Sequence, residues 1–473
     1  MSLFKSIQKY KNKIALVDEI SGPITYNRLV KESLAIKKNI PKKSLTFLIS
    51  HNSVASIICY VSAIKHNNAV VLIDIKTNVE NIIQLFNLYK PSFIMAPKSW
   101  LKTSSLNNFE VKESIFDYVI CKTKNTKLFE INPELNLLLP TSGSMGSPKF
   151  VQLSNKNLKS NTDSIIKSLN IKSKDKTITT MPFSYSFMLS VINTYLESGA
   201  CIVASNYSLF EKGFWEQFKK NKITSLSGVP YIYEILIKLG LQRIYIPSLK
   251  TLTQAGGKLN DNLAKKLILF SKTKKIKFYM MYGQTEAAPR MSVLDWSFAE
   301  KKIGSIGKAI PNTKMWLEDK KGNRIKKSNI TGELVFKGKN VSLGYCSNIK
   351  DLNSKDKNKG ILKTGDLASF DKEGFFYIQG RKNRIVKIFG NRFNLDEIES
   401  KMEEQDFNVV CKERGGKLKV FFETNASKEE VLKSITQITG QNKVAFDCVK
   451  INKIPRTSSG KVDYLKIDWS LNA

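Results

Sequence analysis

Short apolar runs alternate with longer helix-like segments along the N-terminal part of the chain. The helix-like segments include Ser53–His66 and Val79–Tyr89. The apolar runs, each bounded by polar turn residues, are Thr46–Ser50, Val70–Ile75, Ser92–Ala96, Tyr118–Cys121 and Thr177–Thr180. This alternation predicts an α/β domain whose sheets are largely parallel.

The pattern changes near Ile306, where β-rich segments separated by Gly, Asp and Asn turns replace the alternation. These segments are Lys314–Glu318, Gly332–Lys337 and Gly374–Ile378. They predict a β-rich subdomain over about residues 306–380. The polar stretch Ser347–Gly360 is interpreted as an exposed connection.

A final α+β piece begins near Arg381. We expect a helix at Leu395–Glu404, a strand at Lys417–Glu423 and a second helix at Lys428–Ile438. The predicted organisation is therefore a large N-terminal domain, residues 1–380, followed by a small C-terminal domain, residues 385–473.

Composition narrows the class of protein. With 473 residues and 42% hydrophobic content, the chain can bury a large core and form two or more domains. The formal net charge of +35 could indicate a polyanion-binding face, but lysines are scattered along every segment and arginine is scarce. A solvated, Lys-rich surface is the favoured interpretation, so no nucleic-acid partner is expected.

Cysteine and histidine usage excludes several chemistries. The six cysteines lie far apart and form no Cys-x-x-Cys pair, which is typical of reduced cytosolic thiols. With only His51 and His66, the chain has little material for a zinc site or a Ser/His/Asp triad. The sequence shows neither a secretory signal nor an apolar stretch long enough for a membrane span, so we expect a cytoplasmic protein.

The most informative segment is Thr141–Lys149, which follows an apparent strand ending at Pro140. Its small residues would let backbone N–H groups approach an anion, its hydroxyls add donors, and Lys149 adds a point charge. The spacing is not that of the Walker loop, and for the loop alone a flexible Ser/Gly turn is the alternative. The helix expected at Asn155–Leu169 places the loop beside the carboxyl ends of strands, where ligands usually bind.

Five separated segments share one pattern with a known family. They are Thr141–Lys149, Met281–Ala287 (Met-Tyr-Gly-Gln-Thr-Glu-Ala), Gly332–Leu334, Lys363–Leu367 (Lys-Thr-Gly-Asp-Leu) and Pro455–Lys461 (Pro-Arg-Thr-Ser-Ser-Gly-Lys). In order and spacing the chain resembles the adenylate-forming superfamily of acyl-CoA synthetases, peptide-synthetase adenylation domains and firefly luciferase. The resemblance runs from about Ile24 to Lys461.

The resemblance implies ATP and Mg²⁺ as cofactors and assigns residues to them. The implied ATP-binding residues are Thr141, Ser142, Gly143, Ser144, Lys149, Gly256, Gly257, Tyr282, Gly283, Asp366 and Arg381. Thr285 would meet the α-phosphate, and Glu286 would hold Mg²⁺ through a hard oxygen ligand. Lys461 would bridge the substrate carboxylate and the α-phosphate during adenylation.

Relatives in this superfamily swing the C-terminal domain about a residue two places after the arginine that corresponds to Arg381. Here that residue is Asn383, within a hinge at residues 381–384. The family usually carries Asp or Lys at this position. A pivot need not be of a particular residue type, so a hinge is still expected.

The acid pocket implied by the resemblance involves Tyr185, Gly228, Gln284 and Arg290. Amino-acid-activating relatives carry an aspartate in the segment that corresponds to Met181–Ile192, which here contains no acid. This disfavours an α-amino acid, because a buried ammonium without a counter-charge is costly. Arg290 either contacts a second carboxylate or polar group of the substrate or, as arginine more commonly does, forms a structural salt bridge.

The expected function is an ATP-dependent acid–thiol ligase that makes an acyl-adenylate and then a thioester, with CoA as the favoured acceptor. One alternative is an adenylation enzyme that loads a carrier protein, whose phosphopantetheine ends in the same thiol. Two alternatives from other classes are luciferase-like oxygenation of the adenylate and non-enzymatic polyanion binding.

Overall fold

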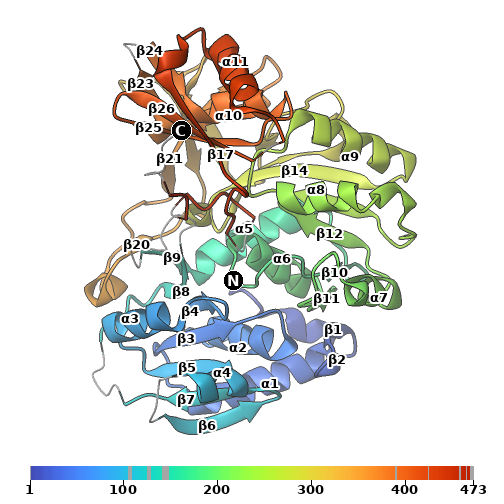
Figure 1. Ribbon diagram of the computed structural model, residues 1–473. Coiled ribbons are helices and arrows are strands. Elements are labelled where there is room, and N and C mark those ends of the chain that lie inside the picture. The colour runs from blue at the N-terminus through green and yellow to red at the C-terminus, as the bar shows by residue number, and fades with distance from the viewer. Residues whose placement is uncertain are drawn as a thin grey trace.

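The computed structural model describes residues 2–104, 109–124, 129–140, 149–388, 391–423, 425–457, 460–464 and 466–468. Two large sheets and the helices packed on them form the main body (Figure 1). The expected α/β architecture, with a β-rich part and a smaller C-terminal α+β part, is confirmed.

The first sheet has the strand order β16-β15-β14-β13-β12-β10-β11-β1-β2. Its parallel strands are β1 (Ile14–Asp18), β10 (Lys176–Ile178), β11 (Cys201–Val203), β12 (Ser225–Gly228), β13 (Thr251–Gln254) and β14 (Lys277–Gly283). Antiparallel strands at its edges are β2 (Gly22–Thr25), β15 (Arg290–Leu294) and β16 (Lys308–Ala309). The carboxyl ends of the parallel strands therefore meet at one edge.

The second sheet has the order β20-β9-β8-β4-β3-β5-β7-β6. Its parallel strands are β3 (Leu45–Ser50), β4 (Ala69–Asp74), β5 (Phe93–Pro97) and β8 (Leu135–Pro140). Its antiparallel strands are β6 (Glu110–Ile115), β7 (Tyr118–Lys122), β9 (Phe150–Ser154) and β20 (Gly344–Cys346). Strands β8 and β9 pair directly, so the segment 141–148 connects two neighbouring strands rather than leading straight into a helix.

Helices cover both faces of both sheets. Those between the sheets are α1 (Tyr26–Asn39), α2 (Val54–Lys65), α5 (Asn155–Leu169) and α6 (Ser186–Glu197). Those on the outer faces are α3 (Val79–Tyr89), α4 (Lys98–Thr103), α7 (Lys212–Lys220), α8 (Pro230–Lys238) and α9 (Asp261–Thr273). The central layer is the most apolar part of the molecule, because helices there have sheet on two sides.

Local sequence signals explain where helix α5 begins and ends. The Ser154 side chain accepts from the Asn157 backbone N–H, and the Asn157 side chain accepts in return from the Ser154 N–H. This capping box satisfies two of the N–H groups left free at a helix start. The helix ends at Leu169, and the next residue, Asn170, adopts the left-handed conformation that asparagine tolerates. The bounds expected for α3 and α5 are confirmed.

The β-rich part is a five-stranded antiparallel sheet with the order β18-β17-β19-β21-β22. Its strands are β17 (Lys314–Glu318), β18 (Arg324–Ile325), β19 (Gly332–Lys337), β21 (Ile361–Phe370) and β22 (Phe376–Arg381). The stretch 347–360 is mostly exposed, as expected. It is attached to the second sheet by a 3₁₀ turn, η5 (Ile349–Asn353), whose Leu352 is buried and whose Asp351 carbonyl accepts from Gln152 of β9 at 2.6 Å.

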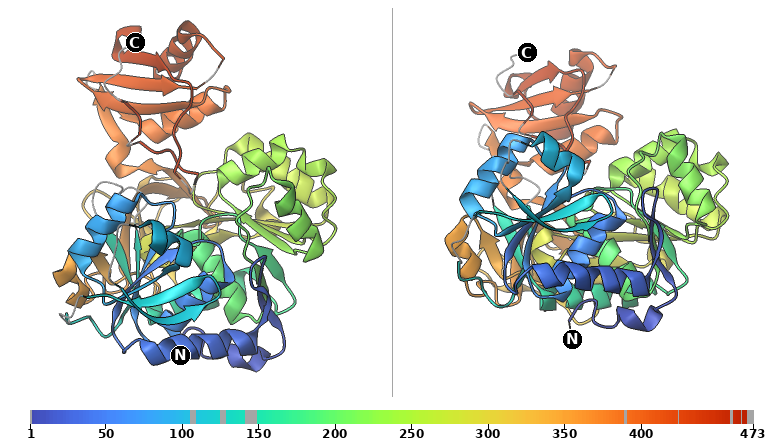
Figure 2. Two further views of the ribbon diagram at one scale, coloured as in Figure 1. Left: turned by 60° about the horizontal axis from the view of Figure 1, so that its bottom comes forward. Right: turned by 90° about the horizontal axis from the view of Figure 1, so that it is seen from below.

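The C-terminal part has sheets and an apolar core of its own and forms a separate lobe (Figure 2). Its elements are β23 (Ile385–Ile388), β24 (Asn391–Asn394), α10 (Leu395–Glu403), β25 (Val409–Arg414), β26 (Lys417–Phe422), α11 (Lys428–Thr439) and β27 (Phe446–Lys450). The two helices and the strand expected after Arg381 are confirmed to within one residue at each end.

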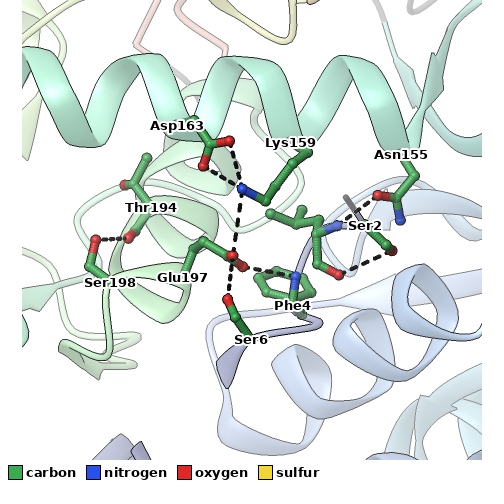
Figure 3. Close-up of polar contacts among 10 residues, drawn as sticks. Ser2, Phe4, Ser6, Asn155, Lys159, Asp163, Thr194, Glu197 and Ser198 are labelled. Carbon is green, nitrogen blue, oxygen red and sulfur yellow. Dashed lines mark hydrogen bonds and ion pairs between the residues drawn. The ribbon is translucent and has the colours of Figure 1, made fainter. Parts of the chain in front are cut away.

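The N-terminal segment before β1 is fixed by a buried carboxylate (Figure 3). Glu197, at the end of α6, accepts from the Phe4 backbone N–H at 2.8 Å and from Ser6 Oγ at 2.9 Å. Lys159 of α5 lies 3.8 Å from the same carboxylate and also pairs with Asp163. The segment thereby closes one side of the central helical layer, where Phe4 is fully buried.

All six cysteines are buried and unpaired, as expected for reduced thiols. Over the described ranges, the structure contains no helix with the length and apolar character that a bilayer crossing would require.

Candidate active site

Loops that follow the carboxyl ends of β12, β13 and β14 come together with the N-terminus of α6. Gly228 ends β12, Gly256 and Gly257 follow β13, and Gly283 ends β14. The short turn η3 (Thr285–Ala287) follows at once, and its Thr285 Oγ1 lies 3.0 Å from Ser186 Oγ, in the first turn of α6. The sheet edge thus gathers residues separated by about a hundred positions in the sequence.

Asp366 forms a buried polar corner on strand β21. Its carboxylate accepts from Tyr282 Oη and from Gln284 Nε2 (2.8 Å), and Arg381 Nε lies 3.1 Å from its other oxygen. Burial raises the pKa of Asp366, while Arg381 and the two hydrogen-bond donors oppose that shift. The corner combines a carboxylate with three donors from two other segments, which suits recognition of vicinal hydroxyls.

Glu286 and Lys149 share one aromatic neighbour, Tyr345 of β20. The Tyr345 hydroxyl donates to Glu286 Oε1 at 2.9 Å, and Lys149 Nζ lies 3.6 Å from the centre of the Tyr345 ring. Burial and, to a smaller extent, the contact with Glu286 raise the pKa of Tyr345, so it remains a neutral donor. The arrangement holds a carboxylate and a cation side by side without a direct ion pair.

Lys461 reaches this region from the far end of the chain. Its Nζ lies 5.9 Å from the centre of the Tyr185 ring. Burial lowers the pKa of Lys461, and nearby Arg381 lowers it further, whereas Glu286 and Asp366 raise it. The side chain is therefore within electrostatic range of all three groups.

Backbone geometry explains how the loop that carries Lys461 can approach. Gly460 has φ of +80°, and a Cβ atom there would lie 3.1 Å from Val229 Cγ2. The turn is closed by a hydrogen bond from the Thr457 N–H to the Lys461 carbonyl at 2.7 Å. Glycine is thus required both for the conformation and for the close approach.

Tyr185 lies between the strand ends and α6. Its hydroxyl faces Gly256, where a Cβ atom would lie only 2.6 Å from Tyr185 Oη and where φ is +86°. Burial raises the pKa of Tyr185 to about 12, so the phenol is neutral at physiological pH. Any larger residue at 256 would displace this ring.

Arg290 does not form the salt bridge expected as its commoner role. It is 2% exposed, its Nη2 donates to Ser190 Oγ at 3.1 Å, and its guanidinium stacks 4.0 Å from the Phe187 ring centre. No Asp or Glu in the described ranges forms an ion pair with it. That expectation was wrong because sequence alone does not show which carboxylates lie nearby.

Other predicted residues occupy different surroundings. Gln284 points into the Asp366 corner, bonding Asp366 and the Thr364 carbonyl, rather than toward Tyr185. Glu234, which could have supplied a carboxylate to the acid pocket, lies instead within electrostatic reach of Glu403 on α10. Asn383 is exposed in the turn η6 (Lys382–Arg384) between β22 and β23. Thr141, Ser142, Gly143 and Ser144 lie outside the described residues.

The sequence did not single out Tyr345, Phe187 or Ser190. Tyr345 lies 59 positions from Glu286, within a polar stretch that carries no motif. Phe187 and Ser190 belong to the buried helix α6, where an aromatic and a serine are unremarkable. Only the pairing of distant segments gives them a role.

Few side chains at this site could bind a metal ion directly. No group of three or more His, Cys, Asp or Glu side chains with metal-binding geometry occurs in the part of the chain that the structure describes. Glu286 is a single carboxylate, half-buried beside Lys149. Mg²⁺ commonly binds through one or two carboxylates together with substrate phosphates, so these residues fit that mode and not a dedicated protein cage.

Comparison with known proteins agrees with this site. A family model described as AMP-binding enzyme matches residues 3–346. The chain is 26% identical to the 2-succinylbenzoate–CoA ligase of Listeria innocua, over 83% of this chain and 81% of that protein. It is 25% identical to the D-alanine–D-alanyl carrier protein ligase of Staphylococcus haemolyticus, over 95% and 94%.

Solved structures show the same fold. The o-succinylbenzoate CoA synthetase of Bacillus subtilis, in complex with its acyl-adenylate intermediate, matches with a TM-score of 0.79 at 18% identity, covering 98% of each chain. The same Bacillus enzyme in complex with ATP and magnesium ion matches with a TM-score of 0.77 at 19% identity, covering 97% of this chain and 98% of that chain.

Proposed function

Because this chain belongs to the family of AMP-binding enzymes, we propose that it is an ATP-dependent acid–thiol ligase. It joins a carboxylic acid to AMP, releasing pyrophosphate, and then transfers the acyl group to a thiol, with CoA as the acceptor. The observation that carries this proposal is the placement of Lys461, from the far end of the chain, within range of Glu286, Asp366 and Arg381.

The nucleotide end of the site follows from the donors and acceptors present. Asp366 would accept hydrogen bonds from the ribose hydroxyls, and Tyr282, Gly256 and Gly257 would border the adenine. Thr285 would meet the α-phosphate, and Lys149 with the segment 141–148 would bind the outer phosphates. Magnesium held by Glu286 would neutralise phosphate charge, as the metal does in phosphoryl chemistry generally.

Lys461 addresses the main electrostatic problem of adenylation. The carboxylate and the α-phosphate are both negative and repel each other as they approach. A preorganised ammonium between them offsets that repulsion in the transition state. Its partly buried setting strengthens the interaction, because water no longer screens it.

The second half-reaction needs the same acyl-adenylate to face a thiol. We propose that the C-terminal domain, residues 385–473, turns on the hinge at residues 381–384, with Asn383 as the pivot, and withdraws Lys461. The N-terminal domain, residues 1–380, with its β-rich subdomain at 306–380, would stay fixed. The lobe has its own core, which supports movement as a unit.

The acid is proposed to lack an ammonium group. The segment Met181–Ile192 contains no acid, Glu234 lies within electrostatic reach of Glu403, and Arg290 adds a positive charge beside α6. A buried ammonium would meet repulsion and no counter-charge. The named relatives include both a CoA ligase and a carrier-protein ligase, so a carrier-protein phosphopantetheine is the second candidate acceptor.

Pyrophosphate exchange tests the proposal directly. The purified protein should catalyse ATP–pyrophosphate exchange with at least one carboxylic acid from a panel that includes propionate, lactate and D- and L-alanine. Addition of CoA should then yield AMP and an acyl-CoA. Propionate or lactate should exceed the alanines by about 10²-fold in specificity, the expected cost of burying an unpaired charge.

Contrary outcomes separate the alternatives. A clear preference for an alanine would replace the acyl-CoA assignment by carrier-loading adenylation. An adenylate that forms but does not react with CoA, while reacting with a phosphopantetheinylated carrier, would change the acceptor alone. Failure of every acid to support exchange by a protein that binds ATP would contradict the proposed ligase activity.

A further inference from the structure

Arg290 is one of the largest fully enclosed side chains in the molecule. It opens strand β15, and its backbone is held from two sides, because its carbonyl accepts from Asn161 Nδ2 at 2.8 Å and from Asn340 Nδ2 at 3.1 Å. Its backbone is therefore fixed, and its side chain is enclosed by the residues packed around it, with 2% of its surface exposed.

The charge on Arg290 has no counter-ion. Its Nε has no hydrogen-bond partner in the part of the chain that the structure describes. Tyr185 is the neighbour that favours the charged form of Arg290, and its phenol is neutral. Every Asp and Glu of the chain lies within the described ranges, and none pairs with it. Burial lowers the pKa of Arg290 to about 9, which still leaves it charged at neutral pH.

The contacts that Arg290 does make recover only part of the cost of burial. The hydroxyl of Ser190 and the face of Phe187 are favourable partners for a cation. Neither carries a negative charge, and a buried cation without an anion is strongly unfavourable. Guanidinium matches carboxylate in planar, two-pronged geometry, so a carboxylate is the partner that this side chain fits best.

The position of Arg290 connects it to the reacting end of the site through the first turn of α6. The Phe187 ring, on which Arg290 stacks, lies 6.5 Å from the Tyr185 ring, and Lys461 lies over that second ring at 5.9 Å. Two cations thus flank one pair of aromatic rings. A substrate lying along these rings would meet Lys461 at one end and Arg290 at the other.

A small cavity of about 20 Å³ adjoins Arg290. Hydroxyl side chains line it, among them Thr194, Ser227 and Thr253. Asp175 also lines it, but its carboxylate accepts from the Lys172 N–H at 2.7 Å and forms no ion pair with Arg290. The volume accommodates about one water molecule, which can solvate the guanidinium but cannot neutralise it.

We propose that the acid activated by this protein carries a second anionic group, and that Arg290 binds it. The substrate class is then a dicarboxylic acid, with one carboxylate adenylated beside Lys461 and the other paired with Arg290. This inference rests on the proposed ligase function and specifies its substrate. Tyr185 and Phe187 would form the apolar floor between the two ends.

The test compares each dicarboxylic acid with its own monoamide, which keeps the size and loses the second charge. The pairs are malonate and malonamate, succinate and succinamate, glutarate and glutaramate, and isophthalate and 3-carbamoylbenzoate. We expect the best diacid to exceed its monoamide by about 10²-fold in kcat/KM for pyrophosphate exchange, since an unpaired buried charge would remain with the amide. This measurement needs only the unaltered protein.

Arg290→Met keeps the length of the side chain and removes its charge. The ratio of diacid to monoamide should fall to about one, through loss of diacid activity rather than loss of nucleotide binding. Arg324→Met is the matched control, because Arg324 also stacks on an aromatic ring, that of Trp316 at 4.9 Å, but is exposed. Its ratio should stay that of the unaltered protein, and ATP-dependent stabilisation should persist in both variants.

The outcomes separate the inference from the proposed function. If monocarboxylic acids or monoamides support exchange as well as the diacids do, the inference is wrong and the ligase function stands. A diacid preference that survives Arg290→Met would also overturn it. Exchange with no acid of either kind, by a protein that still binds ATP, would overturn the proposed function and with it the inference.

Discussion

Lys461 is surrounded by charged groups from three separate parts of the chain. Glu286 comes from the turn after β14, Asp366 from β21 and Arg381 from the end of β22. Single substitutions here should act on chemistry more than on folding, because Lys461 lies on a loop outside the apolar cores.

Lys461→Ala should slow adenylate formation by about 10²–10³-fold, the usual cost of removing a preorganised donor from a transition state. Thioester formation from a supplied acyl-AMP should change much less. Measuring the two half-reactions separately tests this. Lys466→Ala is the control, since Lys466 is exposed and forms a pair with Asp463 at 3.7 Å. Equal losses in both half-reactions for Lys461→Ala would contradict the assigned role.

The pH dependence of adenylation should follow the protonation of Lys461. Burial and Arg381 lower its pKa, and only the protonated form can offset negative charge, so the rate falls as pH rises through that pKa. Arg381→Gln removes a neighbouring positive charge and should move the alkaline limb of the kcat/KM profile to higher pH. Lys382→Gln, at an exposed pair with Glu333, should leave the limb in place. An unmoved limb in Arg381→Gln would show that the two charges do not interact.

At the scale of elements, helix α6 serves two purposes. Its first turn supplies Ser186 and Phe187 to the site, and its last residue, Glu197, holds the N-terminal segment in place (Figure 3). The helix is buried along its whole length, so both ends are fixed relative to each other. Anchoring the chain's start therefore also stiffens the support behind the site.

Glu197→Ala should lower the free energy of unfolding by about 1–3 kcal/mol, because the buried N–H of Phe4 would lose its acceptor. Chemical denaturation measures the loss. Glu300→Ala is the matched control, since its pair with Lys272 is exposed and should contribute little. A similar stability for the two variants would mean that the contacts of Glu197 contribute no net stability. Pyrophosphate exchange per folded molecule should change little in either variant.

At the scale of the whole molecule, two lobes meet around the site. The C-terminal lobe contacts the main body through exposed polar pairs, such as Lys258 Nζ with Ser400 Oγ at 3.4 Å, and through the loop at Gly460. Polar contacts of this kind can be exchanged with water at little cost. Such contacts are compatible with the proposed turn of the C-terminal lobe on the hinge at residues 381–384.

Asn383→Pro should permit adenylate formation and impede thioester formation, because proline fixes φ at the proposed pivot without altering the groups around Lys461. The adenylate should accumulate in rapid-quench measurements. Asn383→Ala is the control, since alanine leaves φ free, and both half-reactions should proceed normally. If Asn383→Pro carries out both at the unaltered rate, the pivot lies elsewhere.

Sequence patterns located several elements and the order of the site segments, although the strand expected at Gly374–Ile378 is β22, Phe376–Arg381. Helices α3 and α5 and strands β17 and β19 have the expected bounds, because their apolar spacing and capping residues act over a few neighbouring positions. The family was identifiable for the same reason. Its motifs are short, local and in a fixed order.

Tertiary structure alone decided which side chains meet. The sequence could not show that Tyr345 contacts both Lys149 and Glu286, that Gln284 bonds Asp366, or that Arg290 lacks a counter-ion. These facts depend on how strands far apart in the chain are packed, and a charge has no partner until the fold brings one within a few ångströms. Local spacing therefore fixed the helices and strands, whereas long-range packing fixed the electrostatics of the site.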